Sequence, residues 1–350
     1  MATALKSMQQ EEVLAKRPQG WWQSKAMKRF RRNPLAIVGL LIVFGFFLLA
    51  LLAPLITTPG RSCLRDLGLS ASTAGDAQNP TKAAFWKLMF AAPFESTPYY
   101  ACYSTPRTSF SPIPQPPAES KTLLGTTSNG YDIYYGIIWG TRTAFFIGVV
   151  VVGSGLLIGI IIGSIAGYFG GWIDNALMRF LDVIFSLPGI VIAMVIITVL
   201  GNNLINIVIA LAATQWAGYA RFLRGDILRV KELDFVSSAK ALGARNAGVI
   251  FKHVLPNSIS SLVIIASLDI GSVVLGAAAL SFLGLGVPLG FADWGQMINF
   301  ARNWILGPPG KPFAYWFVSF WPGLAITFFV MGWNLLGDAV RDVLDPRSNT

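Results

Sequence analysis

Long runs of apolar residues alternate with shorter polar stretches along this 350-residue chain. The first run, from Leu35 to Ile56, has 22 residues, enough for a helix that rises about 1.5 Å per residue to cross a bilayer core of about 30 Å. It is too long for the core of a signal peptide. The later runs predict five more spanning helices, so the expected fold is an all-α integral membrane protein with six transmembrane helices. The predicted helices cover residues 35–57, 139–167, 180–200, 203–221, 257–283 and 314–337. Pro188 is expected to kink the third of them.

Composition and charge support a membrane location. Hydrophobic residues make up 54% of the chain and charged residues only 13%, about half the charged share of a soluble domain. A formal net charge of +10 would suggest nucleic-acid binding in a soluble protein. In a membrane protein it reflects the excess of Lys and Arg in cytoplasmic loops. We therefore expect a lipid-embedded protein that binds no nucleic acid.

The distribution of charge predicts which segments are cytoplasmic. Eight Lys or Arg and two Glu lie in residues 1–34, and seven Lys or Arg and three acidic residues lie in 221–256. Both segments are expected inside, and an even number of spans returns the C-terminus there. The expected organisation is a basic cytoplasmic N-terminal segment (1–34), a first helix (35–57), an extracytoplasmic insertion and pre-helix segment (58–138), a five-helix core (139–340) with a cytoplasmic loop (221–256), and a cytoplasmic tail (341–350).

The two cysteines of the chain, Cys63 and Cys102, both lie in the segment predicted to be outside. An oxidising compartment allows a disulfide between them, which we expect; two free thiols are the alternative. A bridge that closes a loop of this size can stabilise by roughly 3–4 kcal/mol.

Several kinds of chemistry are not expected in this chain. His253 is the one histidine, so a histidine-based metal site is not expected, nor is a catalytic triad that uses more than that imidazole. The chain has no G-x-x-x-x-G-K-[ST] phosphate loop, so it does not bind ATP by that device. No metal or cofactor is expected in the chain itself.

Four glycines recur every fourth residue in the second predicted helix, at 155, 159, 163 and 167. This spacing places them on one helical face, where the missing side chains let another helix approach closely. The stripe therefore predicts a tight contact between two spanning helices.

The cytoplasmic loop carries a short amphipathic hairpin, DFVSSAKALGARNAGVIFKHVLP. Asp234 is a suitable N-cap, and Phe235, Ala239 and Leu242 share one face at helical spacing. Gly243 can adopt a positive φ and end the first helix. Because the apolar face has no core of its own, we expect the hairpin to dock on a cytoplasmic protein.

This hairpin resembles the coupling motif of bacterial ABC-importer permeases, E-A-A-x3-G-x9-I-x-L-P. The spacing is kept from Ser237 through Gly243 to Pro256, although Ser237 stands where the family often has Glu and His253 where it has an apolar residue. The resemblance implies a type I ABC-importer permease architecture, with this loop docked on an ATPase. The implied ATPase-coupling residues are Asp234, Phe235, Ser237, Ser238, Ala239, Lys240, Ala241, Leu242, Gly243, Ala244, His253 and Pro256.

Further segments resemble the C-type subunit of the dipeptide/oligopeptide/nickel permease family. They are LGTTSNGYDIYYGIIWGTRTAF before the second helix, LSFLGLGV with WGQMI after the fifth, and FWPGLAITFFVMGWNLLGDAVRDVLDPR near the C-terminus. Asp132 and Arg142 match the first of these and are expected in the outer part of the molecule. The resemblance implies a subunit that imports di- or oligopeptides, with nickel chelates or oligosaccharides as alternatives.

The same resemblance implies a set of partners in the prokaryotic plasma (inner) membrane. They are a homologous B-type permease subunit, two ATP-binding subunits that carry ATP and Mg²⁺, and an extracytoplasmic substrate-binding protein. The chain itself would then be a non-catalytic subunit.

One ionisable residue, Asp269, lies midway along the fifth predicted helix. A charge at that depth is a functional candidate by default, so Asp269 is expected in the translocation pathway, where it could face a peptide's amino terminus. A structural hydrogen bond is the alternative. An ion-coupled secondary carrier would need several such carboxylates and repeated halves, and a membrane enzyme would need a cluster of polar catalytic groups; neither pattern is evident.

Overall fold

The computed structural model describes residues 33–57, 63, 93, 97, 100–108 and 111–344. Within these ranges the chain forms helices and turns, with isolated bridges but no β-strand. Residues 1–32 of the predicted basic segment, much of the first half of the predicted segment 58–138, and residues 345–350 of the predicted tail lie outside the described residues. The helices are α3 (Pro34–Ile56), η3 (Tyr100–Tyr103), α6 (Pro117–Ser120), α7 (Ile133–Phe169), α8 (Gly171–Phe185), α9 (Gly189–Leu200), α10 (Leu204–Val230), α11 (Asp234–Ala241), α12 (Asn246–Val249), η4 (Ile250–Val254), α13 (Leu255–Phe282), α14 (Trp294–Ala301) and α15 (Trp316–Leu344).

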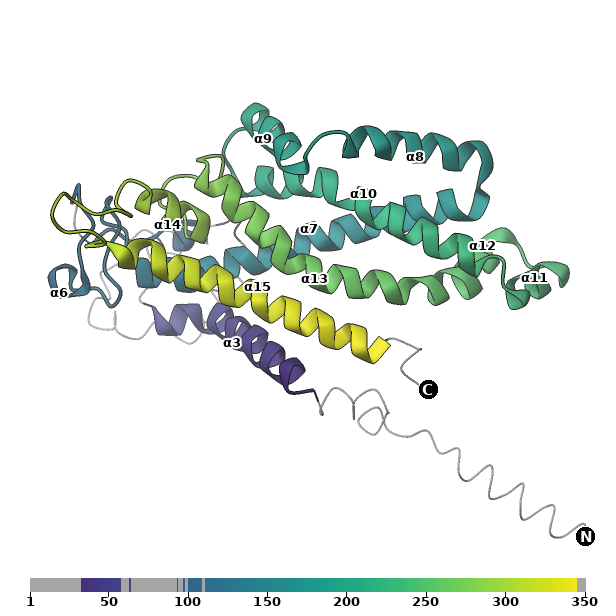
Figure 1. Ribbon diagram of the computed structural model, residues 1–350, viewed down its shortest axis with the longest axis horizontal. Coiled ribbons are helices and arrows are strands. Elements are labelled where there is room, and N and C mark those ends of the chain that lie inside the picture. Colours follow the sequence, from purple (N-terminus) through teal and green to yellow (C-terminus); the bar gives the residue numbers. More distant parts are fainter. Residues whose placement is uncertain are drawn as a thin grey trace, which may run out of the picture.

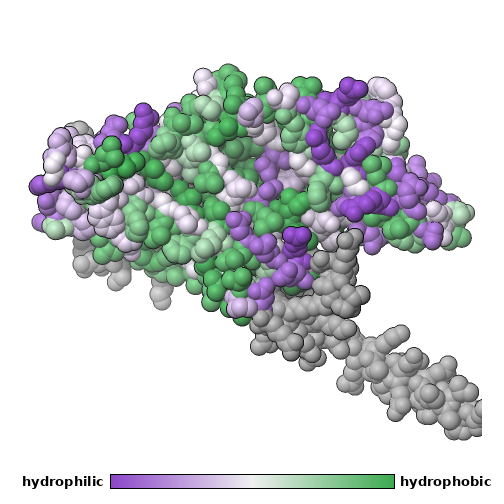
Figure 2. Space-filling model, viewed as in Figure 1, coloured by the Kyte–Doolittle hydropathy of each residue, from purple (hydrophilic) through white to green (hydrophobic). Residues whose placement is uncertain are grey.

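The long helices lie side by side along the longest axis of the molecule (Figure 1). Short elements gather at its two ends, α6 and α14 at one and α11 and α12 at the other. Four helical stretches are long and apolar enough to cross a membrane, and a fifth is added if the bent pair α8–α9 is one span. Figure 2 shows apolar surface over the middle of the molecule and polar surface towards both ends. This helical architecture with several apolar spans confirms the all-α membrane-protein class expected from the apolar runs.

The glycine stripe forms a tight contact between two long helices, and it confirms the close helix pair predicted from the sequence. All four glycines of α7 face α10. A Cβ added at Gly159 would lie 2.5 Å from the Cβ of Tyr219, and one at Gly163 would lie 2.7 Å from the carbonyl oxygen of Ala220. Only hydrogen fits at these positions, because the backbones of the two helices meet there.

The segment predicted as one helix at 180–200 bends at Pro188, as expected, but the bend is a full break between two helices. The chain instead forms α8 and α9, which meet at an angle of 79°. Pro188 explains the break, because its ring disfavours a helical conformation for Leu187 and its nitrogen has no hydrogen to donate. Two N–H groups of α9 then bond to the carbonyl oxygen of Pro188, so that the second helix starts afresh.

Three other boundaries differ from the prediction. Helix α7 begins at Ile133 because the Asp132 side chain accepts hydrogen bonds from the N–H groups of Tyr134 and Tyr135 and so caps it. Helix α10 continues to Val230 instead of ending near 221, so about a quarter of the predicted cytoplasmic loop 221–256 is an extension of that helix. Helix α15 continues to Leu344, which includes the first residues assigned to the tail.

The first and last helices are joined at one end. The Asn33 side-chain oxygen caps α3, accepting from the N–H groups of Leu35 and Ala36, and its amide nitrogen donates to Asp342 Oδ2 at 3.1 Å. Both described ends of the chain therefore lie at the same end of the bundle, towards α11 (Figure 1).

Candidate functional site

The predicted coupling hairpin is a compact elbow at one end of the bundle. Helix α11 ends where Gly243 adopts a φ of +82°, as the sequence predicted. Its N–H donates to the carbonyl oxygen of Lys240, and the N–H of Ala244 donates to that of Ala239. The chain then turns back through α12 and η4 into α13, and residues 246–282 form one helical run. Pro256 lies in the first turn of α13, where its missing N–H is tolerated.

The predicted N-cap of α11 is wrong. Leu233 occupies that position with extended backbone angles, and no side chain caps the helix. Asp234 is the first helical residue, so its carboxylate lies in the first turn. There it still complements the positive end of the helix dipole.

The elbow has one face packed on the molecule and one face exposed. Val236, Val249 and Val254 are fully buried and hold the elbow against the ends of the long helices. Leu242 is 89% exposed and Phe235 is 42% exposed, on the face that the sequence predicted to be apolar. The other predicted coupling residues follow the same division: Ala239 and His253 are half-buried, and Asp234, Ser237, Ser238, Lys240, Ala241, Gly243, Ala244 and Pro256 are exposed.

Polar contacts tie the elbow to the end of α7. The Tyr168 hydroxyl donates to Asn246 Oδ1 at 2.9 Å, and the Lys240 ammonium lies 5.4 Å from the centre of the Tyr168 ring. The Lys231 ammonium donates to the carbonyl oxygen of Gly167 at 3.0 Å, near the negative end of the α7 dipole. These contacts fix the elbow to α7, so a displacement of the elbow moves the bundle with it.

Helix α8 is held to α10 by two ion pairs. Arg224 binds Asp174 through two hydrogen bonds, of 2.9 Å and 2.6 Å, and Arg221 donates to Asp182 at 2.5 Å. The Asp174 pair is partly shielded from solvent, so it contributes more than the exposed Asp182 pair. The broken segment is thus fastened to the helix that leads into the elbow.

Asp269 lines a pocket between the α8–α9 break, α10 and α13. The pocket has a volume of about 270 Å³ and is lined by Asp269, Gln215, Thr214, Ser272, Gly189 and Gly276, among others. Gln215 Nε2 donates to Asp269 Oδ2 at 3.0 Å. The sequence prediction missed Gln215 and Thr214, although both are polar residues inside an apolar run. The pocket lies away from the elbow, so the candidate residues form separate groups.

The outer candidates, Asp132 and Arg142, belong to a third group at the opposite end of the bundle. Asp132 caps α7. Burial raises the pKa of its carboxyl group, and the hydrogen bonds that it accepts from the N–H groups of Tyr134 and Tyr135 only partly oppose this rise. The Arg142 guanidinium lies 5.1 Å from the ring centre of Trp139 and 5.7 Å from that of Tyr103. The electron-rich faces of the two rings attract the positive guanidinium group, so these contacts stabilise Arg142 in its buried position.

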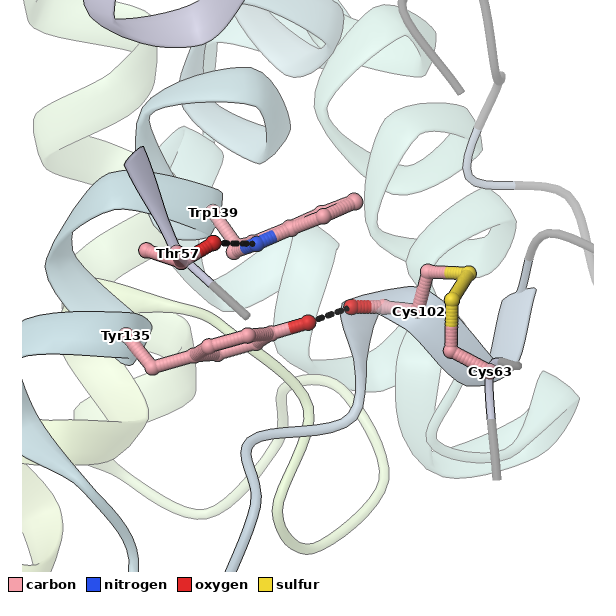
Figure 3. Close-up of a disulfide and its surroundings, with 5 residues drawn as sticks. All are labelled: Thr57, Cys63, Cys102, Tyr135 and Trp139. Carbon is pink, nitrogen blue, oxygen red and sulfur yellow. Dashed lines mark hydrogen bonds between the residues drawn. A yellow bond between two sulfur atoms is a disulfide. The ribbon is translucent and has the colours of Figure 1, made fainter. Parts of the chain in front are cut away.

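A disulfide joins Cys63 to Cys102 near these residues, as the sequence predicted (Figure 3). The Tyr135 hydroxyl donates to the carbonyl oxygen of Cys102 at 2.6 Å. The Trp139 indole donates to Thr57 Oγ1 at 2.9 Å. These bonds attach the outer segment and the end of α3 to the first turns of α7.

Asp293 is a buried acid that the sequence analysis did not select. It caps α14, accepting from the N–H of Gln296 at 2.8 Å. Gln296 in turn accepts from the N–H of Gly290 and donates to the carbonyl oxygens of Val287 and Pro288. The pattern D-W-G-Q, an acid followed three residues later by Gln, is a capping signature that could have revealed it. Burial raises the pKa of Asp293 to about 6.

This pKa predicts a pH dependence for the outer loops. Since the folded pKa lies above the ordinary value of 3.8, the folded protein holds the proton more tightly. The stabilisation is complete below about pH 3.8 and is lost as the pH rises through about 6. Lowering the pH from 7.5 to 5 should therefore stabilise the wild type by about 1 kcal/mol more than Asp293→Asn. Melting of both proteins in lipid nanodiscs across this range checks the difference; parallel profiles would contradict it.

Two family models match this chain. A family model described as "Binding-protein-dependent transport system inner membrane component" matches residues 159–350. A second, "N-terminal TM domain of oligopeptide transport permease C", matches residues 20–73. The chain therefore belongs to the family of binding-protein-dependent inner-membrane components, the permeases of ABC transporters.

Three similar proteins show which group of that family the chain belongs to. The chain is 33% identical to the "Dipeptide transport system permease protein DppC" of Alkalihalophilus pseudofirmus, over 92% of this chain and 89% of the relative. It is 32% identical to the "Oligopeptide transport system permease protein OppC" of Bacillus subtilis, over 96% and 93%. It is 40% identical to the "Glutathione transport system permease protein GsiD" of Pectobacterium atrosepticum, over 64% and 72%. The chain is a C-type permease subunit of the dipeptide/oligopeptide group.

Proposed function

We propose that this chain imports di- or oligopeptides as one of two permease subunits of an ATP-driven transporter. The exposed elbow carries the proposal, because Leu242 and Phe235 leave a solvent-facing apolar surface beside the ends of the long helices. Family membership supports a permease over an ion-coupled carrier. The names of the relatives support a peptide substrate.

The proposed topology has six spans: α3, α7, the α8–α9 pair, α10, α13 and α15. Helix α10 carries Thr214 and Gln215 within its apolar part, which suits a helix facing a pathway instead of lipid. Cytoplasmic termini are supported by the basic loop 221–256 and by the Asn33–Asp342 hydrogen bond, which joins the two described ends on the side of the bundle towards the elbow. The segment that holds the Cys63–Cys102 disulfide then lies outside.

The proposed partners follow from this arrangement. The coupling residues 234–244, with His253 and Pro256, would dock in one of two ATP-binding subunits, which bind ATP and Mg²⁺ and carry out hydrolysis. A B-type permease would complete the pathway, and a binding protein would deliver peptide to the outer end. This chain would contribute no catalytic group.

A mechanical argument links the elbow to transport. The elbow is joined to α7 through the Asn246–Tyr168 hydrogen bond and to α13 without a break. It is joined to α10 through a three-residue connection, in which Lys231 makes a second bond to α7. A pull by closing ATPases would thus reach three long helices at once. Short, hydrogen-bonded helices transmit such a displacement with little internal deformation.

Transport by a reconstituted complex tests the proposal. The chain, a B-type subunit, two ATPases and the binding protein would be placed in proteoliposomes with radiolabelled alanyl-alanine. ATP-dependent uptake that vanishes when the ATPases are omitted is the expected result. Uptake that follows a proton gradient without ATPases would overturn the proposal in favour of a carrier.

A further inference from the structure

The pocket around Asp269 is built from groups that an apolar membrane span does not normally contain. Asp269 lies in the middle of α13, and its neighbours across the pocket are the amide of Gln215 and the hydroxyls of Thr214 and Ser272. Ionisable residues at such depth are costly and usually face a ligand or a partner charge. The pocket also lies at the α8–α9 break, where Gly189 forms part of the wall.

The carboxylate of Asp269 has weak partners among the described residues. Gln215 Nε2, a neutral donor, binds Oδ2 at 3.0 Å, and the Tyr219 hydroxyl is a second neutral partner. The Ser272 hydroxyl donates to the backbone carbonyl oxygen of Asp269 at 3.0 Å and lies 3.4 Å from Oδ1. The ion pairs within the described ranges join Arg221, Arg224 and Arg229 to other acids. The negative charge of Asp269 is therefore hydrogen-bonded but has no cation to balance it in the part of the chain that the structure describes. A cationic ligand would supply that balance.

Size and ligand set indicate what kind of cation fits. A volume of about 270 Å³ is below the roughly 300–1,000 Å³ of pockets for whole drug-sized ligands, so it suits an end group of a longer molecule. The described residues contain no group of three His, Cys, Asp or Glu side chains placed to hold a metal. One carboxylate with an amide and hydroxyls matches an ammonium group, which donates three hydrogen bonds.

We propose that this pocket binds the protonated α-amino terminus of a peptide, with Asp269 as its charge partner and the wall at Gly189, Leu211 and Val273 beside the first side chain. The inference rests on the proposed function for its ligand, a peptide in transit. It assigns the recognition of one end of the peptide to this chain.

Binding can be measured independently of transport. The full chain in lipid nanodiscs would be examined by saturation-transfer NMR with alanyl-alanine amide, a cation, and with N-acetyl-alanyl-alanine amide, its neutral counterpart. The wild type should transfer saturation to the cation at least tenfold more strongly than to the neutral compound. Asp269→Asn should remove this preference and Asp269→Glu should retain it.

Asp182→Asn is the matched control, because it removes the same charge from an exposed position outside the pocket. It should bind the cationic probe like the wild type. Equal binding of the two probes by the wild type, or an unchanged preference in Asp269→Asn, would overturn the pocket assignment. If the preference depends on Asp269 but the reconstituted complex does not take up peptide, the pocket stands and the transport proposal fails.

Discussion

Substitution of Gly159 by Ala is expected to lower the stability of the protein by about 1–3 kcal/mol, the range of overpacking in a close contact. The added Cβ would lie 2.5 Å from the Cβ of Tyr219 and 3.1 Å from the backbone nitrogen of Ala220. Neither atom is at the flexible end of a side chain, so α7 and α10 must move apart. Thermal melting of the purified protein in nanodiscs measures the loss, and a larger residue such as Leu should prevent folding altogether.

Gly153→Ala provides the matched control on the same helix. A Cβ at Gly153 meets nothing within 4 Å, and replacing Gly by Ala in a helix interior otherwise stabilises by roughly 0.5–1 kcal/mol. The two identical substitutions, six residues apart, should therefore shift the melting temperature in opposite directions. Equal shifts would mean that the close approach of α7 and α10 does not control stability.

Leu242→Asp is expected to weaken the binding of the ATPase subunits by at least tenfold. Full burial of a leucine side chain contributes about 1.5–3 kcal/mol, and a buried unpaired carboxylate adds a desolvation cost. Since Leu242 is 89% exposed in the isolated chain, the change should leave the melting temperature almost unaltered. The affinity of the ATPases for the permease pair, measured by surface plasmon resonance, checks the loss, and ATP-driven peptide uptake should fall with it.

A leucine at the other end of the bundle controls for this variant. Leu306 is 78% exposed and lies between α14 and α15, far along the chain from the elbow. Leu306→Asp carries the same change of side chain but should bind the ATPases normally. Wild-type affinity in Leu242→Asp would show that the ATPases dock elsewhere.

Much of the fold is predictable because it follows from local pattern. The apolar runs locate α3 and α13 to within two residues at each end, and the glycine spacing identifies the face of α7 that meets another helix. Gly243 is predictable for a similar reason, since a helix stop at that point favours a residue that can adopt a positive φ. These features depend on the sequence within one or two helical turns.

The remaining features depend on partners distant in sequence. The run 180–200 is continuously apolar after Asp182, so periodicity alone cannot show that Pro188 breaks it by 79° when many membrane helices contain proline without such a bend. Val236 becomes the buried residue of α11 only when α12 and η4 pack against that helix. Gln215 becomes a candidate only when the fold brings α10 and α13 together around Asp269.

The break between α8 and α9 also has a consequence for the isolated chain in a bilayer. Ser186, Leu187 and Pro188 are exposed, as is much of α9. Lipid tails cannot form hydrogen bonds with the backbone groups that a helix break leaves free. Such a break is therefore stable only where it contacts protein or water. We therefore expect this side of the chain to be turned away from lipid, towards the proposed B-type subunit. One permease subunit alone would then enclose the pathway on one side only. The barrier that prevents ions from crossing the membrane would form only when the two subunits assemble.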